Sequence, residues 1–81
     1  MPQLISTAHQ AGQILTSRRK TLKFSQQAVA AKLGISQNRL SELEEDPARL
    51  TLDRLIALVN ILGLELSIQD KSAPARSTGA W

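Results

Sequence analysis

The chain has 81 residues and no cysteine, which limits it to one small domain without a disulfide framework or a thiolate metal site. It has no apolar run near the roughly 18 residues of a membrane-spanning helix and no basic and apolar leader, so we expect a soluble, cytoplasmic protein with no membrane partner. Its aromatic residues, Phe24 and Trp81, are too few to capture single-stranded nucleic acid by stacking.

The charges are divided unevenly along the chain, although the net charge is only +3. Residues 1–41 hold six cations and no acid, whereas residues 42–81 hold all seven acids and four cations. A basic half of this kind can present a face to a polyanion such as DNA. The alternatives are chance in a short sequence and a scaffold whose basic half contacts another protein.

The first half of the chain predicts two helices. Apolar spacing across residues 7–22 indicates a helix with Ser6 or Thr7 as its N-cap and with cations in its last turn, where they oppose the helix dipole. A second amphipathic run follows Ser25, which is a typical N-cap, and stops at Gly34. Glycine readily takes the left-handed conformation that ends a helix sharply.

Two further helices are predicted beyond this glycine. Ser36 is the expected N-cap of the third helix, whose buried stripe consists of Leu40 and Leu43. Thr51 is the expected N-cap of a fourth helix, in which apolar residues recur at three- and four-residue steps until Gly63. The helical part of the fold is therefore predicted to span residues 7–63.

The pattern changes its period after the fourth helix. Leu64, Leu66 and Ile68 alternate with polar residues, which predicts a half-buried strand over residues 64–70. One strand cannot satisfy its own backbone groups, and the sequence offers no second strand. We therefore expect it to pair with the same strand of a second copy in a homodimer. A fifth short helix, or an extended segment packed on the domain, is the alternative.

The second and third predicted helices, joined at Gly34, have the arrangement of a helix-turn-helix, which places its second helix in the DNA major groove. Amide side chains such as those of Gln37 and Asn38 can bind adenine through N6 and N7, and Arg39 can reach guanine or a phosphate. Lys32 and the amide groups at the two helix starts would hold phosphates. The alternative is that these polar residues are only solvated.

The stretch SQQAVAAKLGISQNRLSELE, residues 25–44, resembles the core of the Cro/repressor helix-turn-helix family, and the likeness covers residues 7–63. It implies a repressor-like, all-α fold of four to five helices. Lys23 and Glu45–Asp46–Pro47 stand where relatives commonly have glycine, so we expect both turns to differ in shape. With the reasoning above, the predicted base contacts are Ser36, Gln37, Asn38 and Arg39, and the predicted backbone contacts are Ser25, Gln26, Lys32, Arg18 and Arg19.

Residues 51–71, TLDRLIALVNILGLELSIQDK, are similar to HipB-like antitoxins within that family. The resemblance implies an antiparallel strand pair at a dimer junction, a palindromic double-stranded operator and a HipA-like kinase toxin as partner, with autoregulation of the operon. A stand-alone phage-type repressor, or a restriction-modification controller without a toxin partner, remains the alternative.

The two chain ends lie outside the predicted domain. Residues 1–6 are expected to form an N-terminal arm, and residues 71–81 are too polar and too rich in small residues to fold alone, so we expect a disordered tail. Trp81 ends this tail, and an exposed indole can anchor a protein in a partner's pocket. The alternative is that it touches nothing.

Little in the sequence suggests an enzyme. His9 is the only histidine and follows closely on a predicted helix start, and the adjacent Glu44 and Glu45 point to different helix faces. There is no glycine-rich phosphate loop and no spacing of metal ligands. We expect no catalytic residue, no metal and no cofactor.

Overall fold

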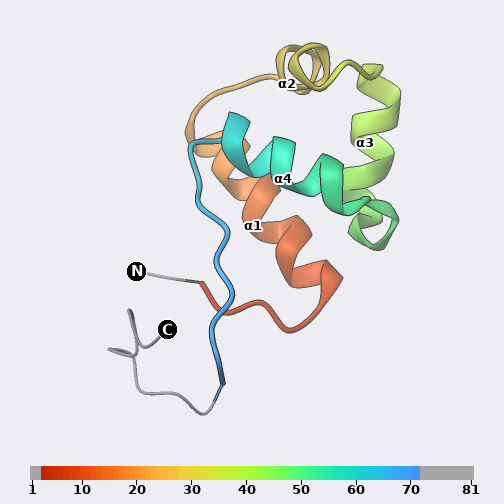
Figure 1. The fold of residues 1–81 in the computed structure, drawn as a ribbon. Helices are drawn as coiled ribbons and strands as arrows, with labels where there is room; N and C mark the ends of the chain where they lie inside the picture. The colour runs from red at the N-terminus through yellow and green to blue at the C-terminus, as the bar shows by residue number, and fades with distance from the viewer. Residues whose placement is uncertain (1–2, 72–81) are drawn as a thin grey trace.

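The structure is a computed structural model that describes residues 3–71. Four α-helices and one short 3-10 helix make up its regular structure (Figure 1), and the helical prediction is confirmed. No helix in these residues is long and apolar enough to cross a membrane. The elements are α1 (Ala8–Thr21), α2 (Gln26–Leu33), α3 (Gln37–Glu45), η1 (Pro47–Arg49) and α4 (Leu52–Ile61).

A hydroxyl side chain caps the start of each α-helix, as the sequence predicts. At α1 the cap is Thr7, and Gln10 completes a capping box in which each side chain bonds the other's backbone N–H. Each hydroxyl satisfies one of the amide donors that a helix start leaves without a partner. The acceptor–donor pairs are Thr7 with Gln10 at 3.2 Å, Ser25 with Ala28 at 3.0 Å, Ser36 with Arg39 at 3.1 Å and Thr51 with Arg54 at 3.3 Å.

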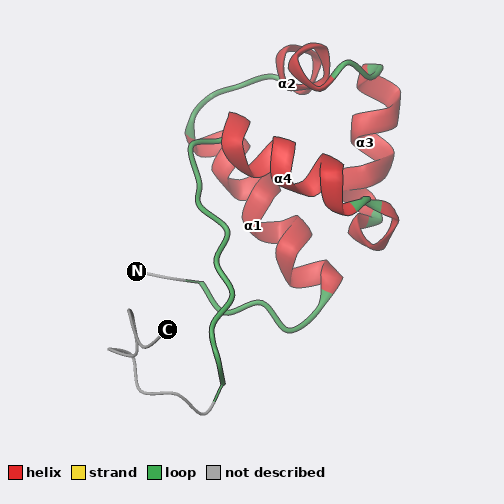
Figure 2. Ribbon diagram, viewed as in Figure 1, coloured by secondary structure: helices red, strands yellow, loops and turns green. Residues whose placement is uncertain are grey.

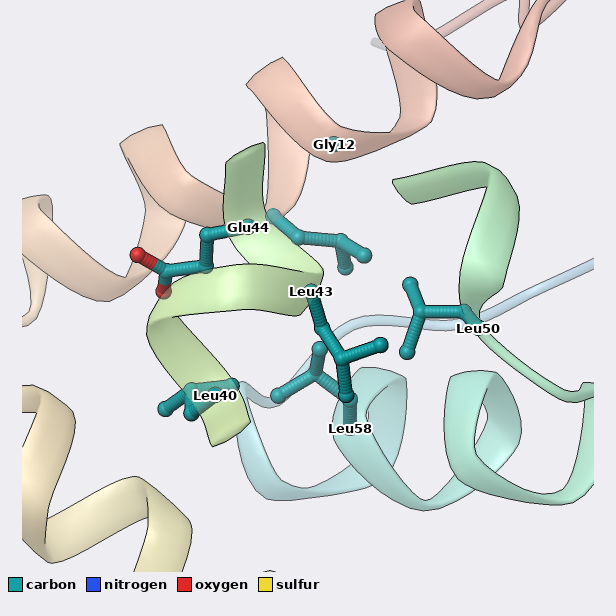
Figure 3. A pocket seen from close by; sticks show the side chains of 7 residues that line it. Gly12, Leu40, Leu43, Glu44, Leu50 and Leu58 are labelled. Atoms are coloured by element: carbon teal, nitrogen blue, oxygen red, sulfur yellow. The ribbon is translucent and has the colours of Figure 1, made fainter. Parts of the chain in front are cut away.

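The core lies where α1, α2, α3 and α4 meet. Leu40 and Leu43, the predicted buried stripe of α3, are 0% and 2% exposed. In the close view Leu43, Leu50 and Leu58 converge on a cavity of about 10 Å³, which is room for one water molecule at most (Figure 3). Burial on this scale fixes α3 firmly to the domain. The core cluster consists of Leu15, Val29, Ala30, Leu40, Leu58, Val59 and Leu62.

The prediction that the turn between α1 and α2 has an altered shape is wrong. We expected Lys23, which replaces a glycine, to change the shape of this turn, but its φ of 61° is left-handed all the same. The turn is held by backbone bonds from the Lys23 amide to Lys20 at 2.9 Å and from the Phe24 amide to Arg19 at 3.1 Å. These bonds impose a strained conformation on a lysine. Asp46, in the second turn that was predicted to differ, has a φ of −131° and so does not take the left-handed conformation that glycine allows.

The structure does not support the predicted strand. Residues 64–70 leave α4 as an irregular segment, and no strand is assigned within residues 3–71 (Figure 2). Leu64 is half-buried and packs against the core, whereas Leu66 and Ile68 are 42% and 96% exposed. A strand requires a neighbour to accept and donate its ladder bonds, and the described part of one chain offers none.

Two predictions concern the ends of the chain. Residues 3–6, part of the predicted arm, are exposed and precede α1 without regular structure. The predicted disordered tail, apart from Lys71, and the predicted anchor Trp81 lie outside the described residues.

Candidate nucleic-acid interface

The connection between α2 and α3 has the geometry of a tight helix-ending turn. Gly34 has a φ of 76°, and its amide donates to Ala31 at 3.2 Å while the amide of Ile35 donates to Ala30 at 3.0 Å. Ile35 is half-buried and packs against the core, and Ser36 then opens the next helix. The chain therefore turns sharply within three residues, so that α3 runs across the direction of α2 and its start lies at the edge of the molecule (Figure 1).

The first turn of α3 is polar on its outer side and apolar on its inner side. Gln37 and Asn38 are exposed, and neither side chain bonds to another residue in the described part of the chain. Leu40 and Leu43 anchor the same helix in the core. The two amide side chains are thus carried on a rigid support, with donors and acceptors available to an external ligand.

Arg39 lies beside these amides but has an intramolecular partner. Its Nη1 donates to Oε1 of Glu42 at 3.2 Å, and the two side chains are 42% and 58% exposed. The pair therefore lies in water at the surface of α3, one turn of helix apart. Arg39 can exchange this partner for an external one at small cost to the fold.

A nearly buried ion pair sets the position of α3 against α1. Arg19 Nε and Nη2 donate to the two carboxylate oxygens of Glu44 at 2.7 and 3.2 Å, and Nη1 donates to the carbonyl of Phe24 at 2.9 Å. Gln26 Nε2 donates to the same carboxylate at 2.8 Å. Figure 3 shows the Glu44 carboxylate turned away from the core cavity. This network joins α1, α2 and α3, and it holds the start of α2 beside α3.

The five residues that are predicted to contact the DNA backbone fall into two groups in the structure. Ser25 and Lys32 are exposed and accessible to a ligand. Gln26, Arg18 and Arg19 instead form internal bonds: Arg18 Nε donates to the carbonyl of Leu62 at 2.9 Å, and Arg19 is only 9% exposed. These bonds show that Arg18 and Arg19 help to fix the helices that carry the interface, and their contacts with DNA stay a prediction.

The helix starts provide a second source of positive potential. The first turns of α1, α2 and α3 contain no acid, whereas α4 has Asp53 in its first turn. An uncompensated helix start keeps the positive end of the helix dipole and its free amide groups for an anion. The starts of α2 and α3 are both part of the helix-turn-helix, so both can face the same polyanion.

Two polar positions next to the predicted residues, one exposed and one partly exposed, were not predicted from the sequence. Gln27 is exposed in the first turn of α2, and Ser41 is partly exposed one turn beyond Gln37 on α3. The signal for Ser41 was available, because residues four apart on a helix lie on one side of it. Both positions extend the polar surface of the helix-turn-helix.

No other site of comparable definition is present in residues 3–71. They contain no group of three or more His, Cys, Asp or Glu side chains that could hold a metal ion. One open hollow of about 560 Å³ runs beside α1, and it is lined by mixed polar and apolar residues that include Gln13, Ser17 and Leu64. Open hollows with few convergent polar groups are poor small-molecule sites.

Comparisons with known proteins agree with this geometry. A family model described as "Helix-turn-helix" matches residues 15–69. Two solved chains, one titled "MDT Protein" and one from "Structure of HipA-HipB-O2-O3 complex", are each 26% identical to this chain with a TM-score of 0.78. Each match covers 86% of this chain and 99% of the other. No curated protein matches.

Proposed function

We propose a function for this chain on the basis of its family: it belongs to the Cro/repressor-type helix-turn-helix family. In this proposal it is a sequence-specific DNA-binding repressor and the antitoxin of a HipA-like kinase toxin. The family supplies the DNA-binding domain. The observation that carries the repressor function is the exposed pair Gln37 and Asn38 at the start of a helix whose other side is buried. Polar base-reading side chains on a rigid helix are what recognition in the major groove requires.

In the proposed complex the start of α3 enters the major groove. Ser36, Gln37 and Asn38 contact base edges, Arg39 reaches guanine O6 and N7, and Ser41 lies at the border of the contact. Ser25, Gln27 and Lys32 face the phosphates with the amide groups of the two helix starts, and Gln26 contributes its amide oxygen. These backbone contacts position the domain, and the base contacts select the sequence.

We further propose that two copies bind one palindromic operator as a homodimer. Leu66 and Ile68 are exposed, and burying them against the same residues of a second copy would remove both from water. An antiparallel pair of the 64–70 segments would also satisfy their backbone groups. The two α3 helices would then read half-sites about one DNA turn, roughly 34 Å, apart.

The proposal of a toxin partner is based on one similar chain, which comes from the structure titled "Structure of HipA-HipB-O2-O3 complex". At 26% identity across 86% of this chain, the likeness supports an antitoxin that represses its own operon together with a HipA-like kinase. Trp81 at the end of the tail would be the anchor for that kinase. A stand-alone repressor, or a restriction-modification controller, would have the same domain and no such partner.

The central test is selection of duplex DNA from a random pool by the full chain, followed by binding measurements over a salt series. We expect an enriched palindrome with two half-sites, bound as a dimer, and an affinity that falls steeply as salt rises. No enrichment, or the same affinity at low and physiological salt, would refute the DNA-binding proposal.

A separate measurement tests the toxin partner. The full chain and a chain ending at residue 71 are each mixed with the HipA-like kinase encoded beside this gene. We expect only the full chain to form the complex, while both bind the selected duplex. Absence of such a kinase gene, or no complex with either chain, would favour the stand-alone repressor, whereas equal binding by both chains would show that the tail is not the anchor.

A further inference from the structure

The junction of α1 and α2 carries four cations, and the structure divides them into two pairs. Arg18 and Arg19 donate hydrogen bonds inside the domain. Lys20 and Lys23 are exposed, and no ion pair or side-chain hydrogen bond joins either ammonium group to another residue within residues 3–71. The positive charge that this junction offers to an external anion therefore comes from the two lysines.

Lys23 has a backbone conformation that is unfavourable for a residue with a side chain. Its φ is 61°, and the turn holds it there through bonds from its own amide to Lys20 and from the Phe24 amide to Arg19. Glycine at this position would avoid the strain. The fold makes no use of the Lys23 ammonium group in return, so a lysine here points to a role outside the fold.

The turn places Lys23 beside the start of α2 and fixes it there. Lys23 lies two residues before Ser25, the N-cap of α2, and the first turn of this helix contains no acid. The Arg19 guanidinium bonds the carbonyl of Phe24 at 2.9 Å and also holds Glu44 of α3. The same side chain thus ties the turn to the helix that is proposed to read DNA. Figure 1 shows this connection and the start of α3 along one edge of the molecule, with α2 between them.

We propose that Lys23 is a DNA-positioning residue whose ammonium group binds a phosphate next to the start of α2; this inference rests on the DNA-binding function proposed above. The charge is carried on a flexible four-carbon stem, which extends beyond the rigid turn. A phosphate contact carries no sequence information and fixes the domain on the duplex. Since the strain is the same in the free and the bound chain, it lowers stability and leaves the affinity to the ammonium group.

The test uses three variants of Lys23 in the full chain. Lys23→Gly removes both charge and strain, Lys23→Gln removes the charge, and Lys23→Arg keeps it. Lys20→Gln is the matched control, because it removes the same charge from an exposed position in the last turn of α1, three residues away. Affinities are measured for the selected operator and for an unrelated duplex over a salt series, and thermal unfolding is recorded for each variant.

We expect Lys23→Gly and Lys23→Gln to weaken binding to both duplexes by about three- to tenfold at physiological salt and to lower the salt slope by about one. Lys23→Arg and Lys20→Gln should stay within about twofold of the unaltered chain. Lys23→Gly should melt at a higher temperature while it binds more weakly. This combination separates the loss of a contact from damage to the fold.

A second measurement locates the phosphate. Operator duplexes are prepared with one uncharged methylphosphonate linkage each, placed in turn along a half-site. We expect one linkage at which the unaltered chain and Lys20→Gln lose affinity but Lys23→Gln loses none, because the partner of that phosphate is already absent. A change of net charge alone would not produce such a position.

Three results would overturn the inference while the proposed function stands. They are an unchanged affinity in Lys23→Gly, an equal loss in Lys20→Gln and Lys23→Gln, and the absence of any linkage to which Lys23→Gln alone is insensitive. If the unaltered chain binds no duplex, the proposed function fails, and this inference fails with it.

Discussion

The Arg19 guanidinium meets the Glu44 carboxylate at two points, Nε to Oε2 at 2.7 Å and Nη2 to Oε1 at 3.2 Å, with side chains only 11% and 13% exposed. This bidentate geometry is the strongest form of arginine–carboxylate pairing. It connects α1 with the last turn of α3, so the direction in which α3 presents Gln37 and Asn38 depends on a contact at the other end of this helix. The pair therefore fixes the orientation of the helix that is proposed to read DNA.

Removing one partner of this pair should destabilise the domain strongly. Glu44→Ala leaves the Arg19 charge almost buried without a counter-ion, and we expect a loss of about 3 kcal/mol in the free energy of unfolding, measured in urea. The double variant Arg19→Met with Glu44→Leu should be more stable than Glu44→Ala, because it buries no charge. Arg39→Ala, which breaks the exposed pair, is the control and should cost less than about 1 kcal/mol. A similarly small loss in Glu44→Ala would contradict the buried character of the pair.

Gly12→Ala should also destabilise the domain, which is the opposite of the usual effect within a helix. Alanine normally stabilises a helix interior by about 1 kcal/mol relative to glycine. At Gly12, however, the added methyl group would overlap the ring of Pro47, which packs directly on α1. We expect a net loss of about 1–3 kcal/mol from overpacking, measured by thermal unfolding.

The double variant Gly12→Ala with Pro47→Ala provides the control for this contact. It removes Cγ and Cδ of Pro47, including the atom nearest to the new methyl group, so its unfolding free energy should exceed the value expected from adding the two single effects. Simple additivity would show that the ring of Pro47 is not what opposes the new side chain.

Lys23→Gly should stabilise the domain, because Lys23 is the one non-glycine residue with a positive φ in residues 3–71. A left-handed conformation costs a residue with a side chain roughly 1–2 kcal/mol, and glycine avoids this cost. The expected result is a higher melting temperature in Lys23→Gly and a smaller rise in Lys23→Asn, since asparagine tolerates this region better than most residues. Lys23→Ala removes the same charge and keeps the strain, so a rise of equal size in that variant would contradict the explanation.

The extent to which the sequence predicted the fold follows from the range of the interactions involved. Thr7, Ser25, Ser36 and Thr51 act within their own helix starts, so local pattern identified three caps and narrowed the cap of α1 to Ser6 or Thr7. The turn at Gly34 was predicted for the same reason. Interactions between residues that are distant in sequence could not be predicted from local pattern.

Arg18 and Arg19 illustrate the second kind of interaction. Their positions in a basic run suggested phosphate contacts, but their partners Leu62 and Glu44 are 44 and 25 residues away in sequence. Periodicity cannot indicate such a pairing, because it depends on how the helices pack. The left-handed Lys23 was missed for a related reason, since the backbone bonds of the turn override the preference of the residue.

Arg18 should influence the proposed dimer through the segment that follows α4. Its Nε donates to the carbonyl of Leu62 at 2.9 Å, directly before the chain turns at Gly63 toward the segment 64–70. Arg18→Met keeps much of the packing and removes this bond, so we expect a weaker dimer by sedimentation with the helical content unchanged. Lys20→Met, on an exposed position of the same helix, is the control. If the Arg18→Met and Lys20→Met variants dimerise with the same affinity, Arg18 has no effect on assembly.

Gln37 and Lys32 should give two different patterns of loss in DNA binding. Gln37 is exposed at the tip of α3, so Gln37→Ala should cost about 1–3 kcal/mol on the selected operator and relax the preference at one base pair in each half-site. Lys32 is exposed in the last turn of α2, where a phosphate contact carries no sequence information, so Lys32→Gln should weaken binding to every duplex alike and lower the salt slope by about one. A repeated selection from random duplexes with each variant distinguishes the two effects. The same enriched sequence from Gln37→Ala as from the unaltered chain would show that the tip of α3 does not read the base.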